Sequence, residues 1–524
     1  MKLNYKRTVF VGFAFFLICS FWQAYDNTIP LILTNKFGMS QAWSGVIMAL
    51  DNVLALFMLP LFGAISDKHR GKRGRRTPFI VVGTLVAAVM LIALSFVDNA
   101  QLKHLSDVSA IDDPAALEQI YDRQADETLL TPGGDKFVLS QKFTQEEFCQ
   151  IRSQVEQNGS TVTNPDYTNY VVPARQACAW DATAKSPVTL VFFIVLLLIV
   201  LVSMAVFRSP AVALMPDVTL KPLRSKANAV INLMGAVGGI LYLGLAAVLY
   251  PASKTHGLAH VSYRPLFLIV SLIMVTAVLI LYLTIKEPKL EAENQKLEAA
   301  HPEWNLAADD GQGHEVLPAP VKRSLTFLLI SISLWFIGYN GVTTWFTKYV
   351  EAVMGEGLGG ASTCLLVATA GAIVSYIPIG ALAAKIGRKR TIQCGIVLLA
   401  ACFMLGYVLT TTYSSIQPIM YVVFALVGLA WAAINVNSLP MVVEMCRGSD
   451  IGKFTGYYYT FSMAAQVVTP IVAGSLMRAI DYRVLFPYAA VFTALAFVTM
   501  LFVRHGDSKP QAKRGLEALD EMED

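Results

Sequence analysis

Residues 51–80 read DNVLALFMLPLFGAISDKHRGKRGRRTPFI. The first part is apolar except for one carboxylate, Asp51, and the chain becomes apolar again from Pro78. Between them lies a loop crowded with basic residues, which also contains Asp67 and two glycines. A weaker copy, GALAAKIGRKR, follows at 380–390. The stretch predicts two apolar helices joined by a basic hairpin, and its copy predicts a chain built from two similar halves.

The composition indicates a membrane protein. Of 524 residues, 55% are hydrophobic and 15% are charged, whereas soluble proteins carry about 25% charged residues. Runs of roughly 20 apolar residues recur, each long enough to cross about 30 Å of hydrocarbon. The net charge of +4 is small, so no nucleic acid or other acidic partner is expected.

Twelve apolar runs are candidate membrane spans, which makes the fold class an all-α membrane protein. One set of connections, which includes 67–76 and 385–390, is rich in Lys and Arg, and the opposite short connections hold one or two at most. Because basic loops stay in the cytoplasm, both termini are expected there. The predicted spans are 8–33, 41–66, 77–97, 187–215, 226–250, 264–285, 324–349, 361–384, 390–411, 418–445, 454–477 and 484–503.

Two polar segments interrupt the spans and define the expected domains. The longer one falls between the third and fourth spans, outside the cell in the predicted topology, and the shorter one links the two halves inside. The parts are an N-terminal bundle (1–97 and 187–285), an extracytoplasmic insertion (98–186), a cytoplasmic linker (286–323), a C-terminal bundle (324–503) and a cytoplasmic tail (504–524).

Cys149 and Cys178 both lie in the insertion. A location outside the cytoplasm permits a disulfide between them. The sequence contains no information on the distance between the two thiols, so their pairing stays open.

Two carboxylates lie inside predicted spans, Asp26 in the first and Asp51 in the second. Ionisable groups in a membrane are costly and usually functional. Because burial favours the protonated form of a carboxylic acid, either could exchange a proton near neutral pH, which predicts proton coupling. The alternative is a fixed structural hydrogen-bonding role. Asn340, at the position equivalent to Asp26 in the second half, cannot titrate, so coupling is expected in the N-terminal half.

Arg208 lies within the fourth span and is a candidate for substrate binding. A buried guanidinium needs a carboxylate or a substrate oxygen as its partner. It could instead extend to the nearer membrane interface. The sequence leaves both readings open.

Polar and aromatic side chains cluster near the middles of several spans. Amides supply donors and acceptors, and aromatic faces stack on the apolar faces of sugar rings, so the set suits a neutral polyhydroxylated molecule. Hydrogen bonding between helices uses the same residue types and is the alternative for each of them. The candidates are Trp22, Gln23, Tyr25, Asn27, Trp335, Tyr339, Asn340, Trp431, Asn435, Asn437 and Gln466.

The basic hairpin is a candidate cytoplasmic gate. Its arginines can bridge Asp67 to neighbouring helix ends, and such ion pairs can hold one conformation and break in another. The alternative is topology anchoring alone, which would not need Asp67. The candidate gate residues are Gly63, Asp67, Arg73, Arg75, Arg76, Asp217 and Arg388.

Enzyme motifs are absent from the sequence. The seven histidines form no metal-spaced group, and neither a phosphate loop (GxxxxGK[ST]) nor a nucleophile elbow (GxSxG) occurs. We therefore expect no enzyme activity, no metal and no cofactor.

The two halves repeat more than the hairpin. Tyr25-Asp26 matches Tyr339-Asn340, and each pair follows a tryptophan. Two parallel six-helix repeats with a site between them near the midplane is the architecture of the major facilitator superfamily.

Several segments resemble sucrose transporter-like proteins of the glycoside–pentoside–hexuronide:cation symporter family. The resemblance implies proton-coupled symport of a sugar or glycoside, and it covers most of the N-terminal half. The matching segments are GRRTPFI at 74–80, PLFGAISD at 60–67, GMSQAW at 38–43, ALMPD at 213–217, ANA at 227–229 and MGAVGGIL at 234–241.

Four positions depart from the relatives. Plant sucrose carriers have a histidine where this chain has Gln41, and an arginine where it has Val212, for which Arg208 could substitute. The sodium-using melibiose permeases have paired acids that match Ala55 and Leu59 here, which favours protons over sodium as the coupling ion.

We expect a monomer in the cell membrane, with the lipid bilayer and a small-molecule substrate as its partners. The alternatives are an exporter or facilitator of another small metabolite, and a transporter-derived receptor that uses the 98–186 segment.

Overall fold

The computed structural model describes residues 3–132, 134–157, 160–220, 224–251, 257–300, 318–445 and 451–506. Twelve helices in these ranges are long and apolar enough to cross a membrane. This confirms the predicted fold class and the number of spans. Most of the predicted tail, 507–524, and the part of the predicted linker at 301–317 lie outside the described residues.

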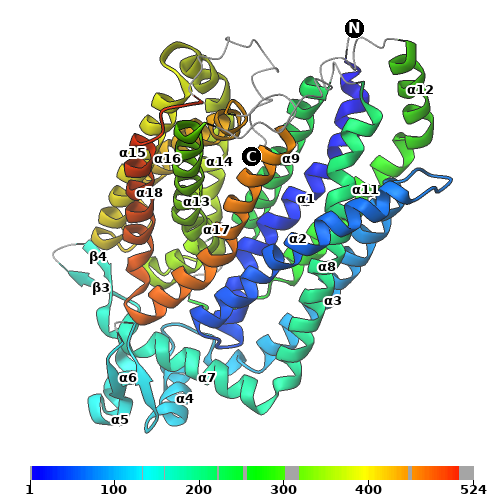
Figure 1. Ribbon diagram of the computed structural model, residues 1–524. Helices are drawn as coiled ribbons and strands as arrows, with labels where there is room; N and C mark the ends of the chain where they lie inside the picture. The colour runs from blue at the N-terminus through cyan, green and yellow to red at the C-terminus, as the bar shows by residue number, and fades with distance from the viewer. Residues whose placement is uncertain are drawn as a thin grey trace.

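The first six spans form one bundle, in which α1 packs against α9 and α11, and α3 packs against α8 and α11 (Figure 1). Helix α1 continues into a π-helical turn, η1, which carries the chain beyond the predicted end of the first span. The elements are α1 (Tyr5–Leu31), η1 (Ile32–Lys36), α2 (Gln41–Lys68), α3 (Thr77–Lys103), α8 (Pro187–Val218), α9 (Arg224–Leu249) and α11 (Arg264–Thr284), followed by the polar helix α12 (Glu287–Ala300).

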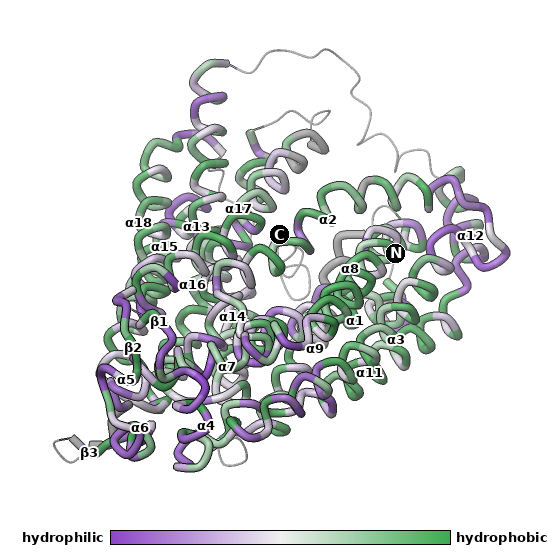
Figure 2. Tube along the Cα trace, turned by 90° about the horizontal axis from the view of Figure 1, so that it is seen from below, coloured by the Kyte–Doolittle hydropathy of each residue, from purple (hydrophilic) through white to green (hydrophobic). Residues whose placement is uncertain are grey.

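The last six spans form the second bundle, which stands beside the first (Figure 2). In it, α13 packs against α17 and α18, and α16 packs against α14 and α15. Its elements are α13 (Ala319–Met354), α14 (Leu358–Ile386), α15 (Arg388–Thr412), α16 (Pro418–Val443), α17 (Ile451–Ala479), η8 (Tyr482–Val484) and α18 (Leu485–Leu501).

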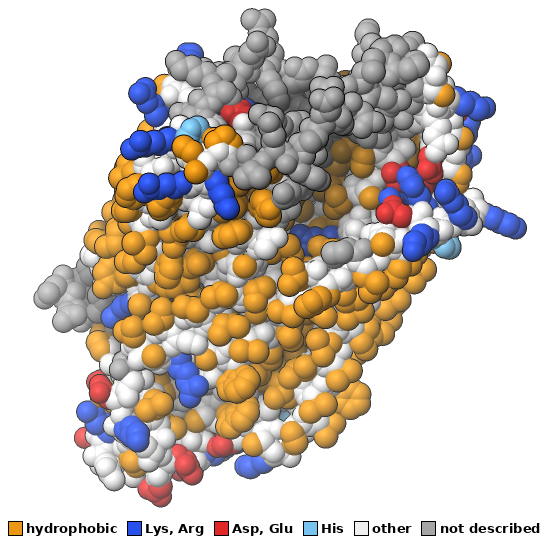
Figure 3. Space-filling view, in the orientation of Figure 1, with side chains coloured by type: hydrophobic (Ala, Val, Ile, Leu, Met, Phe, Trp, Pro, Cys, Tyr) orange, Lys and Arg blue, Asp and Glu red, His pale blue; other side chains and the backbone are white. Residues whose placement is uncertain are grey.

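Hydrophobic side chains cover the middle of the molecule, and charged side chains gather at its two ends (Figure 3). An apolar belt between polar ends is what a lipid bilayer requires of a protein that crosses it, because hydrocarbon cannot solvate charge. The chain is a multi-pass membrane protein.

The two ends differ in structure. One end carries the α2–α3 hairpin, the start of α1 and the end of α18, and we call it the hairpin face (Figure 1). The hairpins of both halves turn at a glycine with positive φ, Gly74 (108°) and Gly387 (94°), a conformation that costs a residue with a Cβ more than glycine. The opposite end is covered by the segment between α3 and α8, and we call it the insertion face.

The insertion folds around a hydrophobic core of its own, which includes Leu117, Phe148 and Val171. Two antiparallel hairpins, β1–β2 and β3–β4, stand beside short helices. Its elements are η2 (Ser106–Val108), α4 (Pro114–Gln124), β1 (Thr128–Leu130), β2 (Lys136–Val138), α5 (Leu139–Lys142), α6 (Gln145–Gln150), β3 (Gln154–Gln157), β4 (Ser160–Thr163), η3 (Tyr167–Val171) and α7 (Val172–Lys185).

The two bundles touch along α1–α13, α2–α17 and α9–α14. Glycines permit a close approach of α2 and α17: a Cβ on Gly45 would lie 2.3 Å from the carbonyl oxygen of Pro470, and one on Gly474 would lie 2.4 Å from that of Gln41. A larger residue at either position would push α2 and α17 apart, as at small-residue helix interfaces in membranes.

Candidate functional site

A cavity of about 230 Å³ lies between the two bundles. Residues from α1, α2 and α8 of the first half and from α13 and α17 of the second line it together. They are Trp22, Asp26, Met48, Asp51, Asn52, Arg208, Asn340, Thr343, Thr344, Gln466 and Pro470. Six residues predicted from the sequence therefore meet at one place: Trp22, Asp26, Asp51, Arg208, Asn340 and Gln466.

The charged groups of this central cavity all come from the first half. The Asp51 carboxylate accepts a hydrogen bond from the Asn52 side chain at 2.9 Å and interacts electrostatically with Arg208. The Arg208 guanidinium lies over the Trp22 ring, 5.5 Å from its centroid. Arg208 therefore lines the cavity rather than extending to the membrane interface, which was the other reading of the sequence.

Two hydrogen-bond donors at the cavity have no partner among the described residues. They are the indole Nε1 of Trp22 and the side-chain Nδ2 of Asn340, one from each half. A buried donor without a partner costs about 1–3 kcal/mol, so both atoms are suited to bind oxygens of a polar ligand. Together with the carboxylates, the cavity offers donors and acceptors to a neutral hydroxylated molecule.

Three further candidates of the first half do not line this cavity. The Tyr25 hydroxyl contacts the carbonyl oxygens of Ile47 and Met48 on α2, both at 3.3 Å. The Asn27 side chain donates to the backbone oxygen of Gln23 at 2.8 Å and to its side-chain oxygen at 3.2 Å. Gln23, Tyr25 and Asn27 are therefore not among the residues that line the central cavity with Trp22, and their predicted role in substrate binding stays a prediction.

Five candidates of the second half are also outside the central cavity. The rings of Tyr339 and Trp431 stack on each other, 3.7 Å between centroids and 5° from parallel, so each covers one face of the other. Trp335 and Asn437 are fully buried, and Asn435 is nearly so. The Tyr339–Trp431 stack joins α13 to α16, and none of the five side chains lines the central cavity with Asn340.

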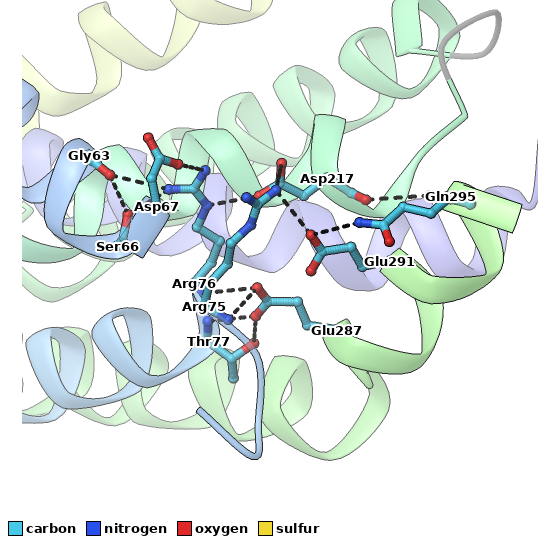
Figure 4. A network of polar contacts seen from close by, with 11 residues as sticks. Gly63, Ser66, Asp67, Arg75, Arg76, Thr77, Asp217, Glu287, Glu291 and Gln295 are labelled. Carbon is cyan, nitrogen blue, oxygen red and sulfur yellow. Dashed lines mark hydrogen bonds and ion pairs between the residues drawn. The ribbon is translucent and has the colours of Figure 1, made fainter. Parts of the chain in front are cut away.

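At the hairpin face, a network of ion pairs joins α2, α3 and α8 (Figure 4). Arg76 pairs with Asp67 and with Asp217, at 2.8 Å. Arg75 pairs with the other oxygen of Asp217 at 2.8 Å. A Cβ on Gly63 would lie 2.8 Å from the Ser209 hydroxyl, so this glycine lets α2 approach α8.

Glu287, at the start of α12, holds the network from the other side and was missed in the sequence (Figure 4). Its fully buried carboxylate accepts hydrogen bonds from the backbone N–H of Arg75, Arg76 and Thr77, each at 2.8 Å, and from the Thr77 hydroxyl at 2.7 Å. It thus binds the N-terminal end of α3, where free N–H groups and the helix dipole favour an anion. A Cβ on Gly74 would lie 2.3 Å from this carboxylate.

One predicted gate residue takes no part in this network. The Arg73 guanidinium lies over the Tyr282 ring, 4.6 Å from its centroid, and no ion pair to it occurs among the described residues. Of the three arginines of the hairpin that were predicted to form the gate, two bind carboxylates and one packs against α11.

The second half has a shorter version of the network. Arg388, which begins α15, pairs with Glu444 at the end of α16, at 2.6 Å. Arg388 and Glu444 occupy the places that Arg76 and Asp217 have in the first half, because each pair joins a third-helix start to a fourth-helix end. The repeat seen in the sequence thus extends to this contact.

At the insertion face, polar contacts cross between the halves. The Asn35 side chain donates to both oxygens of Glu351, at 2.5 and 2.6 Å, and accepts from Lys348. The Thr347 hydroxyl donates to Asn27 at 2.7 Å. We call Asn35, Lys348 and Glu351 the insertion-face latch; the first lies just beyond the predicted end of the first span, where no sequence pattern pointed to it.

The insertion face also contains a fully buried ion pair, Lys36–Asp98 at 2.5 Å, which joins η1 to α3. Next to it lies His260, whose Nε2 is 3.2 Å from the backbone oxygen of Asn35. Burial, together with the charges of Arg175, Lys36 and Lys348, lowers the pKa of His260 to about 3. This imidazole is neutral at ordinary pH.

The two cysteines of the insertion do not form a disulfide. Both thiols are free, although both side chains belong to the core of the insertion. Burial raises the pKa of Cys178 to about 11, so its thiol stays protonated and unreactive.

Comparison with known families identifies the superfamily to which the chain belongs. The family described as Major Facilitator Superfamily matches residues 176–377 and 358–520. The chain belongs to this superfamily. Residues 11–104 also match the family described as MFS/sugar transport protein. The fold and the family are those of transporters rather than enzymes.

Individual relatives match only in part. An uncharacterised protein, YqgE of Bacillus subtilis, is 27% identical over 194 residues, which is 36% of this chain and 44% of the relative. The sucrose transport protein SUC4 of Arabidopsis thaliana is 36% identical over 59 residues, 11% of this chain and 12% of the relative. Each match therefore spans less than half the length of the curated relative.

Solved structures confirm the fold over the whole chain. The inward-open xylose transporter XylE from E. coli is 14% identical, with a TM-score of 0.56, and the alignment covers 99% of both chains. The nucleoside transporter NupG is 14% identical, with a TM-score of 0.55, over 96% of this chain and 100% of the other. At these identities the similarity concerns the fold alone.

Proposed function

We propose that the protein is a proton-coupled symporter of a neutral sugar or glycoside. The observation that carries this proposal is the central cavity, which Asp26 and Asp51 of the first half line together with Asn340 and Gln466 of the second. A binding site shared by two halves lets each half move while the substrate stays between them, which is the requirement of alternating access.

The charges of the cavity support coupling to one proton. With Asp26 and Asp51 both ionised, the cavity carries one negative charge in excess of Arg208, and a proton on either carboxylate makes it neutral. Asp51 already interacts with Arg208 and with Asn52, whereas neither contact is found for Asp26 within the described residues. We therefore assign the transported proton to Asp26 and the role of counter-charge for Arg208 to Asp51.

The substrate class follows from the remaining lining. The free donors on Trp22 and Asn340 suit hydroxyl oxygens, and the Trp22 ring suits the apolar face of a sugar. The match to a sugar transport family and to part of a sucrose transport protein points the same way. Ala55 and Leu59, which replace the acids of the sodium-using relatives, favour protons as the coupling ion.

The orientation in the membrane follows from the positive-inside rule. The hairpin face carries the basic hairpins and is assigned to the cytoplasm, which puts the insertion outside the cell. The latched state described above is then closed to the outside. Because a symporter moves its substrate in the same direction as the proton, an inward proton gradient makes uphill uptake from outside to inside the expected direction.

The experiment is uptake of radiolabelled sugars, sucrose first, into proteoliposomes with an imposed inward proton gradient. Wild type accumulates substrate, and sodium does not replace the proton gradient. Asp26→Asn abolishes accumulation but keeps exchange of labelled for unlabelled substrate, because exchange needs no deprotonation. Asp51→Asn loses both, since it leaves Arg208 without its counter-charge. Asp135→Asn, the same change at an exposed carboxylate of the insertion, behaves as wild type.

Normal accumulation by Asp26→Asn would contradict the coupling assignment. Downhill movement without accumulation by the wild type would identify a facilitator, and accumulation driven by an outward gradient would identify an exporter.

A further inference from the structure

A second cavity, of about 130 Å³, lies at the insertion face and shares no lining residue with the central one. Three parts of the chain build its walls: the end of the first span with Asn35, the insertion with Arg175, and α13 with Lys348 and Glu351. The loop before α11 adds His260. None of these residues is used by the proposed transport site.

Arg175 is a buried cation that forms no ion pair among the described residues. The side chain is 5% exposed, and it donates to backbone oxygens of the 108–111 segment, those of Val108, Ala110 (3.1 Å) and Ile111 (3.4 Å). Its Nε has no hydrogen-bond partner in the part of the chain that the structure describes. A buried guanidinium with only neutral acceptors favours the approach of an anion.

The two lysines near the cavity are already paired. Lys348 and Glu351 bind each other at 2.9 Å, and Lys36 binds Asp98. The Asp112 carboxylate accepts hydrogen bonds from the backbone N–H and the hydroxyl of Ser153. Arg175 is therefore the one of these three cations without an ion pair among the described residues. Burial lowers the pKa of His260, and the charges of Arg175, Lys36 and Lys348 lower it further. The Nδ1 of His260 also lacks a partner among the described residues.

The rest of the wall has an apolar part and a polar part. The apolar part is formed by Ile111, Val172, Leu258, Val261, Ala352 and Leu358, and the polar part includes Ser153, Gln154, Thr168 and Gln176. The apolar part suits the hydrocarbon portion of a small organic molecule, and the polar part can donate hydrogen bonds to its charged end. A cavity of this volume has room for on the order of ten water-sized positions.

We propose that this cavity is a binding site for a small organic monoanion, a carboxylate with an apolar body, whose charge is bound by Arg175. The apolar body lies between α7, α13 and the loop that precedes α11. Because the walls belong to both halves, the ligand binds only while the insertion face is closed. Under the proposed alternating-access function, which this consequence rests on, the ligand holds that state and inhibits transport without competing for the central cavity.

The test uses benzoate as the probe and benzyl alcohol as its uncharged counterpart, with the full-length protein in detergent. Benzoate raises the unfolding temperature by a few degrees in a saturable manner, since a ligand bound by the folded state stabilises it. Benzyl alcohol gives no saturable rise. Ala352→Phe fills the cavity without removing a charge and weakens benzoate binding at least tenfold, as does Arg175→Met. Arg208→Gln, which removes the cation of the central cavity, leaves the benzoate effect intact.

Three results would each overturn the proposal: equal effects of benzoate and benzyl alcohol, no benzoate effect on the wild type, or an unchanged benzoate effect in Ala352→Phe. So would loss of the effect in Arg208→Gln alone, because benzoate would then bind in the central cavity. The binding measurement does not depend on transport. Failure of proton-driven uptake would therefore not contradict this binding site, and failure of benzoate binding would not contradict the symport proposal.

Discussion

The two ends of the molecule hold their charged groups in different ways. At the insertion face, Asn35 of the first half binds Lys348 and Glu351 of the second, so the contact closes the path between the halves. At the hairpin face, the ion pairs that the structure describes stay within one half, Arg76–Asp217 in the first and Arg388–Glu444 in the second. The contact between the halves must break when the insertion face opens. The ion pairs within one half can stay intact and keep that half rigid while it moves.

The largest expected effect concerns rigidity at the hairpin face. Glu287→Ala leaves three backbone N–H groups of the α3 start and the Thr77 hydroxyl without their acceptor, at a cost on the order of 3–5 kcal/mol in the free energy of unfolding. Thermal or denaturant unfolding in detergent measures it. Glu293→Ala, an exposed carboxylate of the same helix whose lysine partner is 3.8 Å away, is the matched control and changes stability by about 0.5 kcal/mol or less. Equal losses in the two variants would show that Glu287 does not organise the hairpin.

The next effect concerns the burial of His260 at the insertion face. Its pKa is about 3 in the folded protein and about 6.5 in an unfolded chain. The folded pKa is the lower one, so the unfolded state takes up protons first, and stability is full above pH 6.5 and falls as the pH decreases toward 3. The expected loss at pH 5 relative to pH 7.5 is about 2 kcal/mol.

His260→Asn removes the titrating group and flattens the pH dependence of the unfolding temperature between pH 7 and pH 5. The asparagine amide can still donate to the Asn35 oxygen. An unchanged slope in this variant would mean that His260 is hydrated and that the face is more open than the contacts indicate.

A third prediction concerns the insertion-face latch itself. Glu351→Gln removes the charge that Lys348 and Asn35 bind and shifts the conformational equilibrium toward an open insertion face by about 1.5 kcal/mol, or roughly tenfold. Spin labels at Ser106 and Tyr413, one on each side of this face, report a larger share of long distances. Asp135→Asn removes an exposed carboxylate at the same end and leaves the distances unchanged. If Glu351→Gln also leaves them unchanged, the latch does not hold the two halves.

The smallest effect separates the arginines of the hairpin. Arg73→Gln loses only a cation–π contact with Tyr282 and costs about 0.5–1 kcal/mol, whereas Arg76→Gln breaks ion pairs with Asp67 and Asp217 and costs several times more. Unfolding of the two variants side by side measures the difference. Similar losses would show that the ion pairs add little beyond anchoring the loop.

The sequence predicted the spans because hydrocarbon accepts only long apolar helices, and this constraint acts on each segment separately. It also predicted the acids and Arg208 of the central cavity, since an ionisable group in a span is rare enough to identify by itself. The aromatic and amide candidates could not be identified in this way, because such residues are common in membrane helices. Tyr25, Asn27 and Trp335 are of types that serve equally well between helices, and only packing decides which side of a helix faces the cavity.

The sequence by itself determined that this chain crosses the membrane twelve times, in two related halves with a basic hairpin in each. The composition of each segment shows whether it can cross the membrane, and the repetition can be seen by comparing the two halves of the sequence directly. Only the tertiary structure decided that Glu287 binds the start of α3, that Asn35 bridges to Glu351, and that Arg175 reaches a cavity shared with α13. These contacts join residues far apart in the chain, so their partners become visible only when the helices are packed.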